Sequence, residues 1–332
     1  MRGPPIALAG TKRNHQHRIM RALGVFVILA LFSLNACAWG ILGHEAGARA
    51  AQKLLSNDVA AKVERILGTN DLASVALWAD HLRDAQRNRG PLRTDAEARD
   101  FNRRFPENRN WHFVNLPLGT LRYVRSSRFV STNDIVHALN LCLAVLEGRS
   151  QEMSKTHALR WLVHLVGDIH QPLHVGCGYY RFKADGRVIL LRQPAEADGH
   201  PHDQGGNLLR FTASQNLHAH WDVGLVETID RSPDNAHLGT ILEEALRPKR
   251  WKTSGPRDRW AARWAADSVK EARTAYKHIE FQAAGFNGLG VLTNIAIKLP
   301  PGYQSNQAAR ARVQLSKSAF HLAEILNRLD WE

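Results

Sequence analysis

The sequence predicts an all-α protein, formed by a single mostly helical domain over residues 39–332. Apolar residues recur at helical spacing in eight segments, several of these segments carry capping residues at their ends, and strand-like runs are scarce. The chain has 332 residues, 44% of them hydrophobic, which is enough for one sizeable core or two small ones, and no linker divides it.

The predicted helices follow one another along the chain. Residues 132–148 give the clearest pattern, because their apolar side chains share one face between a cap at Thr132 or Asn133 and a stop at Gly148. Further along, Pro172 ends the amphipathic pattern that precedes it. The eight predicted helices span residues 43–55, 56–68, 71–87, 132–148, 154–170, 214–229, 257–279 and 305–329.

Two short strand pairings are consistent with the rest of the sequence. Residues 187–193 and 207–211 are apolar enough to form a small hairpin with each other. Alternatively, the turn sequence ADGR joins residues 179–183 to the apolar run that follows it, which predicts a β-hairpin near 178–200.

Residues 1–38 have the three parts of a secretory signal peptide. A basic region runs to Arg21, an apolar run follows, and the small-x-small sequence ACA ends at Ala38, where signal peptidase is expected to cut. The apolar run is too short to predict a membrane span. Cleavage would make Trp39 the N-terminal residue of a periplasmic or secreted protein.

Two alternatives apply to the start of the chain. Met20 directly precedes the apolar run, so translation starting there would still give a signal peptide. The sequence LNAC loosely resembles a lipoprotein box, which would instead make Cys37 the lipid-modified N-terminus. The mature part contains no second apolar stretch long enough to span a membrane, and nothing in it calls for a stable protein partner.

The chain is strongly basic, with a formal net charge of +13. Removing the five basic residues of the signal peptide lowers this charge to +8, which still favours polyanions such as nucleic acid, nucleotides or anionic membrane surfaces. Cys142 and Cys177 remain after cleavage, and in an oxidising compartment they form one disulfide or stay as two buried thiols.

Two His–Asp pairs with the same spacing point to divalent metal. His164 and Asp168 are four residues apart on a predicted helix, and His218 and Asp222 repeat this spacing, so each pair shares a helix face. An imidazole and a carboxylate on one face can bind one ion together. Four further candidate ligands stand elsewhere in the sequence, and the whole set predicts a zinc cluster rather than a histidine-rich protein whose rings are satisfied by hydrogen bonds: His44, Asp80, His112 and His174.

Six motifs in this order resemble the zinc-dependent single-strand nucleases of fungi, plants and bacteria, the family of nuclease S-one and nuclease P-one. The zinc phospholipases C are distant relatives of this family. The resemblance covers roughly residues 39–227 and implies a helical domain of the zinc phospholipase C and nuclease type. The motifs are WGILGH (39–44), WADHLR (78–83), WHFVNLP (111–117), HLVGDIHQPLHVG (164–176), DQGGN (203–207) and NLHAHWD (216–222).

The resemblance implies three zinc ions held by nine residues, and each of the nine has a match in this sequence. Trp39 would bind through its free amine and its carbonyl oxygen, and Asp168 would bridge the first two ions. The remaining ligands are His44 for the first ion; Asp80, His112 and His164 for the second; and His174, His218 and Asp222 for the third.

The resemblance also implies the chemistry. Hydroxide generated on zinc at neutral pH would attack phosphorus, which makes Asp80 and Asp168 the catalytic carboxylates and gives products with 5′-phosphates. Arg83 falls where the family places a basic residue beside the phosphate. Phe113 matches an aromatic residue on which a base stacks, and Asn115 stands where the type enzymes have aspartate, which predicts a changed base preference. Alternatively, Phe113 and Asn115 are packing and turn residues.

The clearest departure from the family is a longer segment over residues 177–202, which contains the predicted hairpin. Tyr179, Tyr180, Arg181 and Lys183 would contact a nucleic-acid strand there, or the segment simply packs on the domain. His170, Asp203 and Asn207 belong to the motifs, but we expect them to be structural.

These observations predict an exported zinc endonuclease acting on single-stranded DNA and RNA and on nucleotides, with 3′-nucleotidase activity as an additional expectation. A zinc phospholipase C is the alternative within phosphodiester chemistry. A periplasmic zinc-binding protein without turnover is the alternative outside enzymes. Nine matched ligands and a basic residue beside the phosphate are more than zinc storage requires.

Overall fold

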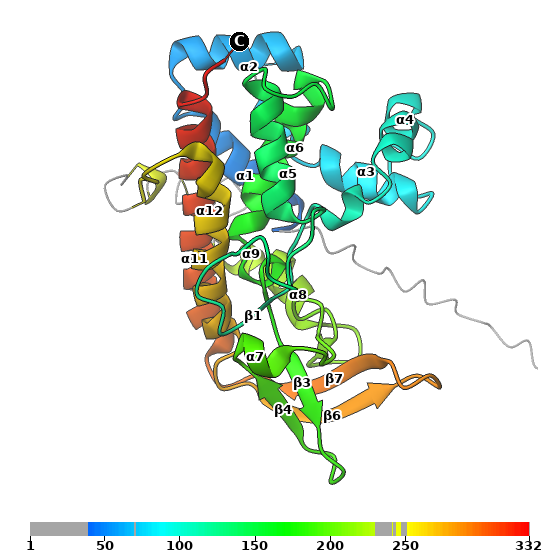
Figure 1. Ribbon diagram of the computed structural model, residues 1–332. Helices are drawn as coiled ribbons and strands as arrows, with labels where there is room; N and C mark the ends of the chain where they lie inside the picture. Colours follow the sequence, from blue (N-terminus) through cyan, green and yellow to red (C-terminus); the bar gives the residue numbers. More distant parts are fainter. Residues whose placement is uncertain (1–38, 70, 230–240, 242–243, 247–250, 332) are drawn as a thin grey trace, which may run out of the picture. The chain divides into compact units, whose positions relative to one another are not determined.

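The computed structural model describes residues 39–69, 71–229, 241, 244–246 and 251–331 (Figure 1). They form mostly α-helix with small sheets, so the all-α prediction is confirmed. The predicted signal peptide and its cleavage site lie outside the described residues. The helices are α1 (Gly40–Gln52), α2 (Asn57–Leu67), α3 (Trp78–Gln86), α4 (Ala96–Arg104), α5 (Ile135–Leu146), α6 (Lys155–His170), α7 (Pro194–Ala197), α8 (Leu217–Ala219), α9 (Val226–Ile229), α11 (Trp260–Ala275) and α12 (Tyr303–Asn327).

Helix α6 is the central element of the helical part. It contacts α1, α2, α3, α5, α11 and α12, and it is buried on nearly every face. Its apolar residues, among them Trp161 and Leu162, join the larger of the two main hydrophobic clusters. Because α6 also carries His164 and Asp168, this packing fixes both side chains inside the protein.

Local capping explains where several helices begin and end. The Ser56 hydroxyl accepts a hydrogen bond from Val59 N at the start of α2, and Gly68 ends α2 in a left-handed conformation. The cap of α5 differs from the prediction of Thr132 or Asn133. Asp134 fills this position, because its carboxylate accepts hydrogen bonds from two backbone amides of the first turn.

Two of the predicted helices are broken. Residues 71–87 form a 3₁₀ turn (Leu72–Val75) followed by α3, and residues 214–229 form α8, a π-helical turn (His220–Gly224) and α9. None of the described helices combines the length and the apolar character that crossing a membrane requires.

The hairpin predicted near 178–200 is confirmed, because β3 pairs with β4 in antiparallel register from Tyr179↔Leu191 to Phe182↔Val188. The alternative pairing of 187–193 with 207–211 is wrong, since β5 lies parallel to β7 instead. A second hairpin, β6–β7, was not predicted. The strands are β1 (Leu116–Pro117), β2 (Gly176–Cys177), β3 (Tyr179–Phe182), β4 (Val188–Leu191), β5 (Leu209–Arg210), β6 (Glu280–Phe286) and β7 (Leu292–Lys298).

Both hairpins lie together near the lower end of α11 and α12 in the view of Figure 1. Aromatic rings join them, with Tyr180 5.4 Å from Phe281 and Phe182 4.9 Å from Phe286 between ring centroids. Of the two alternatives for the cysteines, one disulfide or two buried thiols, the structure has the thiols. Cys142 lies in α5 and Cys177 in β2.

Candidate metal centre

Eight of the nine predicted ligand residues form three buried groups of His and Asp side chains. Helix α6 supplies residues to two of the groups, α1 and α3 add one residue each, and the turn at Pro172 directs His174 to the third group. In each group the candidate ligand atoms lie within 4.8 Å of one another. The groups are His44, Asp80 and His164; His112, His164 and Asp168; and His174, His218 and Asp222.

Asp168 stands between the first two groups. Its Oδ2 lies 2.9 Å from His112 Nδ1 and 3.1 Å from His164 Nε2, whereas its Oδ1 lies 3.3 Å from His44 Nε2. Ligand atoms at about 2.0–2.1 Å from a tetrahedral zinc ion are themselves roughly 3.3 Å apart. The two carboxylate oxygens therefore face two different sets of donors at spacings that suit metal ligands.

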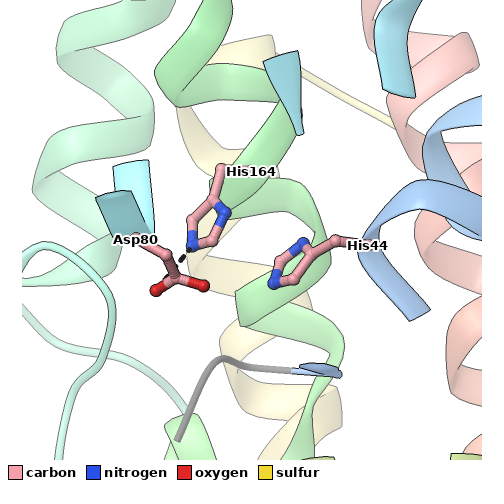
Figure 2. Close-up of side chains that lie close together, drawn as sticks. All are labelled: His44, Asp80 and His164. Atoms are coloured by element: carbon pink, nitrogen blue, oxygen red, sulfur yellow. Dashed lines mark ion pairs between the residues drawn. The ribbon is translucent and has the colours of Figure 1, made fainter. Parts of the chain in front are cut away.

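Asp80 completes the space between these histidines. Its Oδ1 lies 3.8 Å from His164 Nε2 and 3.9 Å from His112 Nδ1. Figure 2 shows Asp80 with His164 and His44, whose rings stack at 4.1 Å, and the three side chains point toward one another. Since they come from α3, α6 and α1, the packing of three helices sets this geometry.

The third group lies where the chain leaves α6 and meets the turn after α8. His218 Nε2 is 3.4 Å from Asp222 Oδ2, and the rings of His174 and His218 stack at 4.8 Å. Asp222 sits inside the π-helical turn, a distortion that is often found at functional sites. Its other oxygen accepts a hydrogen bond of 2.7 Å from Gln171 Nε2, so the carboxylate has one fixed orientation.

In three of the histidines a backbone carbonyl fixes which ring nitrogen carries the proton. The Nδ1 atoms of His164, His174 and His218 each donate to a carbonyl at 2.7 Å, those of Ala76, His112 and Gly205. A histidine that donates through Nδ1 presents the lone pair of Nε2, which is the usual arrangement at metal sites.

Several buried polar atoms of these side chains have no hydrogen-bond partner within the described part of the chain, which indicates whether the residues suit a metal ion. Asp168 Oδ1, Asp222 Oδ2, His44 Nε2 and His174 Nε2 have no hydrogen-bond partner among the described residues, although all four side chains are buried. Such atoms are costly unless something satisfies them. Divalent zinc would satisfy all four, so the donor set fits this ion.

The electrostatics favour ionised carboxylates beside two neutral rings, those of His112 and His174, whereas Asp168 and Asp80 outweigh burial and raise the pKa of His164 to about 9 in the metal-free protein. Burial lowers the pKa of His112 to about 4 and that of His174 to about 3, so both rings keep free lone pairs at neutral pH. Burial disfavours the charge on Asp168, but His164 and His174 outweigh it and hold its pKa well below the usual range. The pKa of Asp222 rises to about 6, chiefly because of burial.

Trp39, the ninth predicted ligand, is fully buried beside the first two groups. Its indole N–H donates to the carbonyl of Gly167 at 2.9 Å, next to Asp168, and its own carbonyl accepts a hydrogen bond from Gly43 N. A carbonyl oxygen has two lone pairs, so this bond leaves one for another partner. Gly167 is required here, because a Cβ atom would lie 2.9 Å from the ring of His44.

The predicted substrate residues lie around this centre. Arg83 is nearly buried in α3 and holds Asp80 Oδ1 at 2.8 Å through a terminal guanidinium nitrogen. The Phe113 ring is 36% exposed directly after His112, and Asn115 is half-buried two residues further on. The predicted strand contact through Tyr179 and Tyr180 is wrong for these two residues, because both are buried, whereas Arg181 and Lys183 are exposed.

Two functional neighbours were missed from the sequence. Gln171 donates a hydrogen bond to Asp222 and orients its carboxylate. Its position between the predicted ligands Asp168 and His174 could have indicated this role. The carbonyl of Ala76 orients His164 from 88 residues away, and no local pattern indicates such a contact. His170, expected to be structural, bonds to Val166 O and to His321.

A sequence model of the S1/P1 nuclease family matches residues 39–330. The chain belongs to this family. Endonuclease 2 of Arabidopsis thaliana is 25% identical over 289 residues, which cover 79% of this chain and 84% of that protein. Nuclease PA3 of a Penicillium species is 28% identical over 311 residues, which cover 88% of this chain and 97% of that protein. Nuclease S1 of Aspergillus oryzae is 32% identical over 156 residues, covering 44% and 47%. The three buried groups of this S1/P1 family member could each hold a metal ion.

Proposed function

We propose that the chain is an exported zinc-dependent endonuclease, which hydrolyses phosphodiester bonds of single-stranded DNA and RNA to 5′-phosphate products and also acts as a 3′-nucleotidase. The observation that carries this proposal is that the two carboxylate oxygens of Asp168 face different ligands. One oxygen faces His44, and the other faces His112 and His164. In a nuclease family, a buried carboxylate shared in this way suits a close pair of metal ions.

Three Zn²⁺ ions at this centre would supply hydroxide at neutral pH and Lewis-acid polarisation of the phosphate. Trp39, His44 and Asp168 would hold the first ion. Asp80, His112 and His164 would hold the second together with Asp168, and His174, His218 and Asp222 would hold the third. Four of the donors are oriented by the protein itself, because His164, His174, His218 and Asp222 each have a hydrogen-bond partner outside the metal groups.

Arg83 is the residue that we expect to bind the phosphate. Its guanidinium lies beside Asp80 and so beside the second group. Arginine carries five N–H donors in a planar fork, which can donate to a carboxylate and also to phosphate oxygens. The side chain is mostly buried, so charge developing on phosphate would be stabilised where water screens it little.

Phe113 and Asn115 would contact the base. The exposed Phe113 ring gives a stacking surface next to His112, and unpaired bases reach such a surface more easily than paired ones. The backbone of Asn115 is fixed by Tyr179, whose hydroxyl donates to its carbonyl at 2.8 Å. The amide side chain offers both a donor and an acceptor to a base edge.

The proposal is tested with mature protein loaded with zinc. We expect acid-soluble nucleotides with 5′-phosphates from single-stranded DNA or RNA, loss of this activity with a chelator, and its return with zinc. His174→Ala should abolish the activity, and His200→Ala, outside the three groups, should retain it. Cleavage of phosphatidylcholine but of neither polymer would establish a phospholipase C instead. Zinc binding without cleavage of any of them would establish a zinc-binding protein.

A further inference from the structure

Asp203, in the DQGGN motif, is a fully buried carboxylate outside the three metal groups. Its Oδ2 accepts a hydrogen bond from the Tyr180 hydroxyl at 2.7 Å, and the Tyr276 hydroxyl lies 3.0 Å from both oxygens. Its Oδ1 accepts from Gly206 N at 2.9 Å and from Gly178 N at 3.3 Å. A buried carboxylate with this many donors is held in one position.

The loop that Asp203 holds also orients a predicted zinc ligand. Gly205, two residues after Asp203, has its carbonyl oxygen 2.7 Å from His218 Nδ1. Gly205 has a φ of +62°, and a Cβ atom there would lie 2.0 Å from Leu173 O, so only glycine fits. Its amide donates to Cys177 Sγ at 3.2 Å. The loop therefore has little freedom to move the carbonyl away from His218.

The two phenols that fix Asp203 come from distant parts of the chain. Tyr180 belongs to β3 of the β3–β4 hairpin, and Tyr276 directly follows α11. Both are fully buried, and burial raises the pKa of each phenol well above its usual range, so each remains an O–H donor. The hairpin thus reaches the third metal group through three consecutive hydrogen-bonded steps: Tyr180 to Asp203, Asp203 to the loop, and the loop to His218.

We propose that Asp203 is a positioning residue for the third metal group, and that one role of the β3–β4 hairpin is to hold Asp203 through Tyr180. This inference rests on the proposed zinc function. It gives the β3–β4 hairpin a role that does not require the hairpin to contact substrate. It also explains why Tyr180 is buried, since its hydroxyl is used inside the protein.

The test compares Tyr180→Phe and Asp203→Asn with Tyr179→Phe in the mature protein. Tyr179 is a matched control because it lies in the same strand, is also buried, and donates to Asn115 O rather than to Asp203. Loss of groups that orient metal ligands typically lowers metal affinity by about 10–100-fold. We expect a fall of about 10-fold for Tyr180→Phe and about 100-fold for Asp203→Asn at one zinc of the three, with the other two unchanged.

Two measurements separate this role from a general loss of structure. Zinc content during competition with a chelator shows whether one ion or all of them are weakened. Histidine ¹H–¹⁵N spectra of zinc-free protein show whether His218 keeps its proton on Nδ1, and we expect a mixture of tautomers in both variants but not in Tyr179→Phe. Wild-type zinc affinity and an unchanged His218 tautomer in Tyr180→Phe and Asp203→Asn would overturn the inference, as would equal weakening of all three ions.

The same experiment distinguishes failure of the inference from failure of the proposed function. Wild-type protein that binds no zinc would contradict the proposed function, and the tautomer of His218 would then still report whether Asp203 orients it. Wild-type protein with three zinc ions, together with variants that match it in both measurements, would contradict only the role of Asp203.

Discussion

At the scale of single residues, the sequence indicated which side chains would meet but not what would orient them. The four-residue spacing of His164 and Asp168 predicted a shared helix face, and both lie on the buried surface of α6. The carbonyls of Ala76 and Gly205 that assign the histidine protons come from other elements. Such contacts depend on tertiary packing, so local spacing carries no signal for them.

The central carboxylate gives the first prediction. Asp168→Ala should abolish nuclease activity and remove about two of the three zinc ions, because both oxygens of this side chain face candidate ligands of different ions. Metal analysis of the purified variant measures this loss. Asp185→Ala, an exposed carboxylate in the β3–β4 turn, is the control and should keep three ions. A full zinc complement in Asp168→Ala would exclude the bridge.

Buried histidines predict acid sensitivity of the zinc-free protein. Burial lowers the pKa of His112 to about 4, of His174 to about 3 and of His321 to about 4, from 6.5 in the unfolded chain. Between pH 6.5 and 4 the unfolded state therefore binds more protons than the folded state. The free energy of unfolding consequently decreases as the pH is lowered through this range. Asp222, with a pKa of about 6, opposes this trend, as do Asp134 and Asp203, whose pKa values burial raises. Burial lowers the pKa of more histidines than these three carboxyls can offset, including His44, His81, His157, His170, His202 and His220.

Urea unfolding of zinc-free protein at several pH values measures this effect. The midpoint should decrease steadily from pH 6.5 to pH 4. His164, whose pKa is raised to about 9 by Asp168 and Asp80 despite burial, stabilises the fold fully below pH 6.5 and loses this contribution as the pH rises through 9. A midpoint that stays constant or increases toward pH 4 would show that these histidines are not buried as described.

At the scale of elements, long amphipathic segments were predictable and short or exposed ones were not. Helices α5 and α6 matched their predicted segments, because each has a capping side chain and a continuous apolar face. Helix α4 was missed, since only two of its residues are buried and its apolar pattern is weak. The β6–β7 hairpin was missed because β6 is mostly exposed and does not alternate.

The exposed cations of the β3–β4 hairpin give a prediction at this scale. Arg181 and Lys183 face solvent, unlike the tyrosines beside them. Reversing both charges, in Arg181→Glu with Lys183→Glu, should weaken binding of long single strands. The slope of the logarithm of the binding constant against the logarithm of the salt concentration should become shallower by about 0.7 per lost phosphate contact. Cleavage of dinucleotides should change little. Equal losses on long strands and dinucleotides would argue against a strand contact.

At the scale of the whole molecule, residues far apart in sequence meet around α6. The candidate ligands extend from Trp39 to Asp222, and the family match extends to residue 330, so the helices after Asp222 belong to the same family region. Among these, α11 and α12 pack against α6 and complete its burial. The sequence predicted this gathering through the order of six motifs, which local periodicity alone would not have shown.

Processing connects the whole chain to the metal centre. Trp39 is the first described residue and lies beside Gly167 and His44, so cleavage before it would create a free amine next to the first predicted ion. An uncut precursor lacks this amine, and lipid modification at Cys37 would leave two residues ahead of Trp39. Either form should bind the first ion weakly and show low activity.

Native mass spectrometry of the purified mature protein tests the central claim most directly, because one measurement gives both the N-terminal residue and the number of bound metal ions. We expect a chain that begins at Trp39 and carries three zinc ions. A chain that begins at Cys37 with three ions and full activity would contradict the role of the Trp39 amine. A chain that begins at Trp39 and binds no zinc would contradict the metal centre itself.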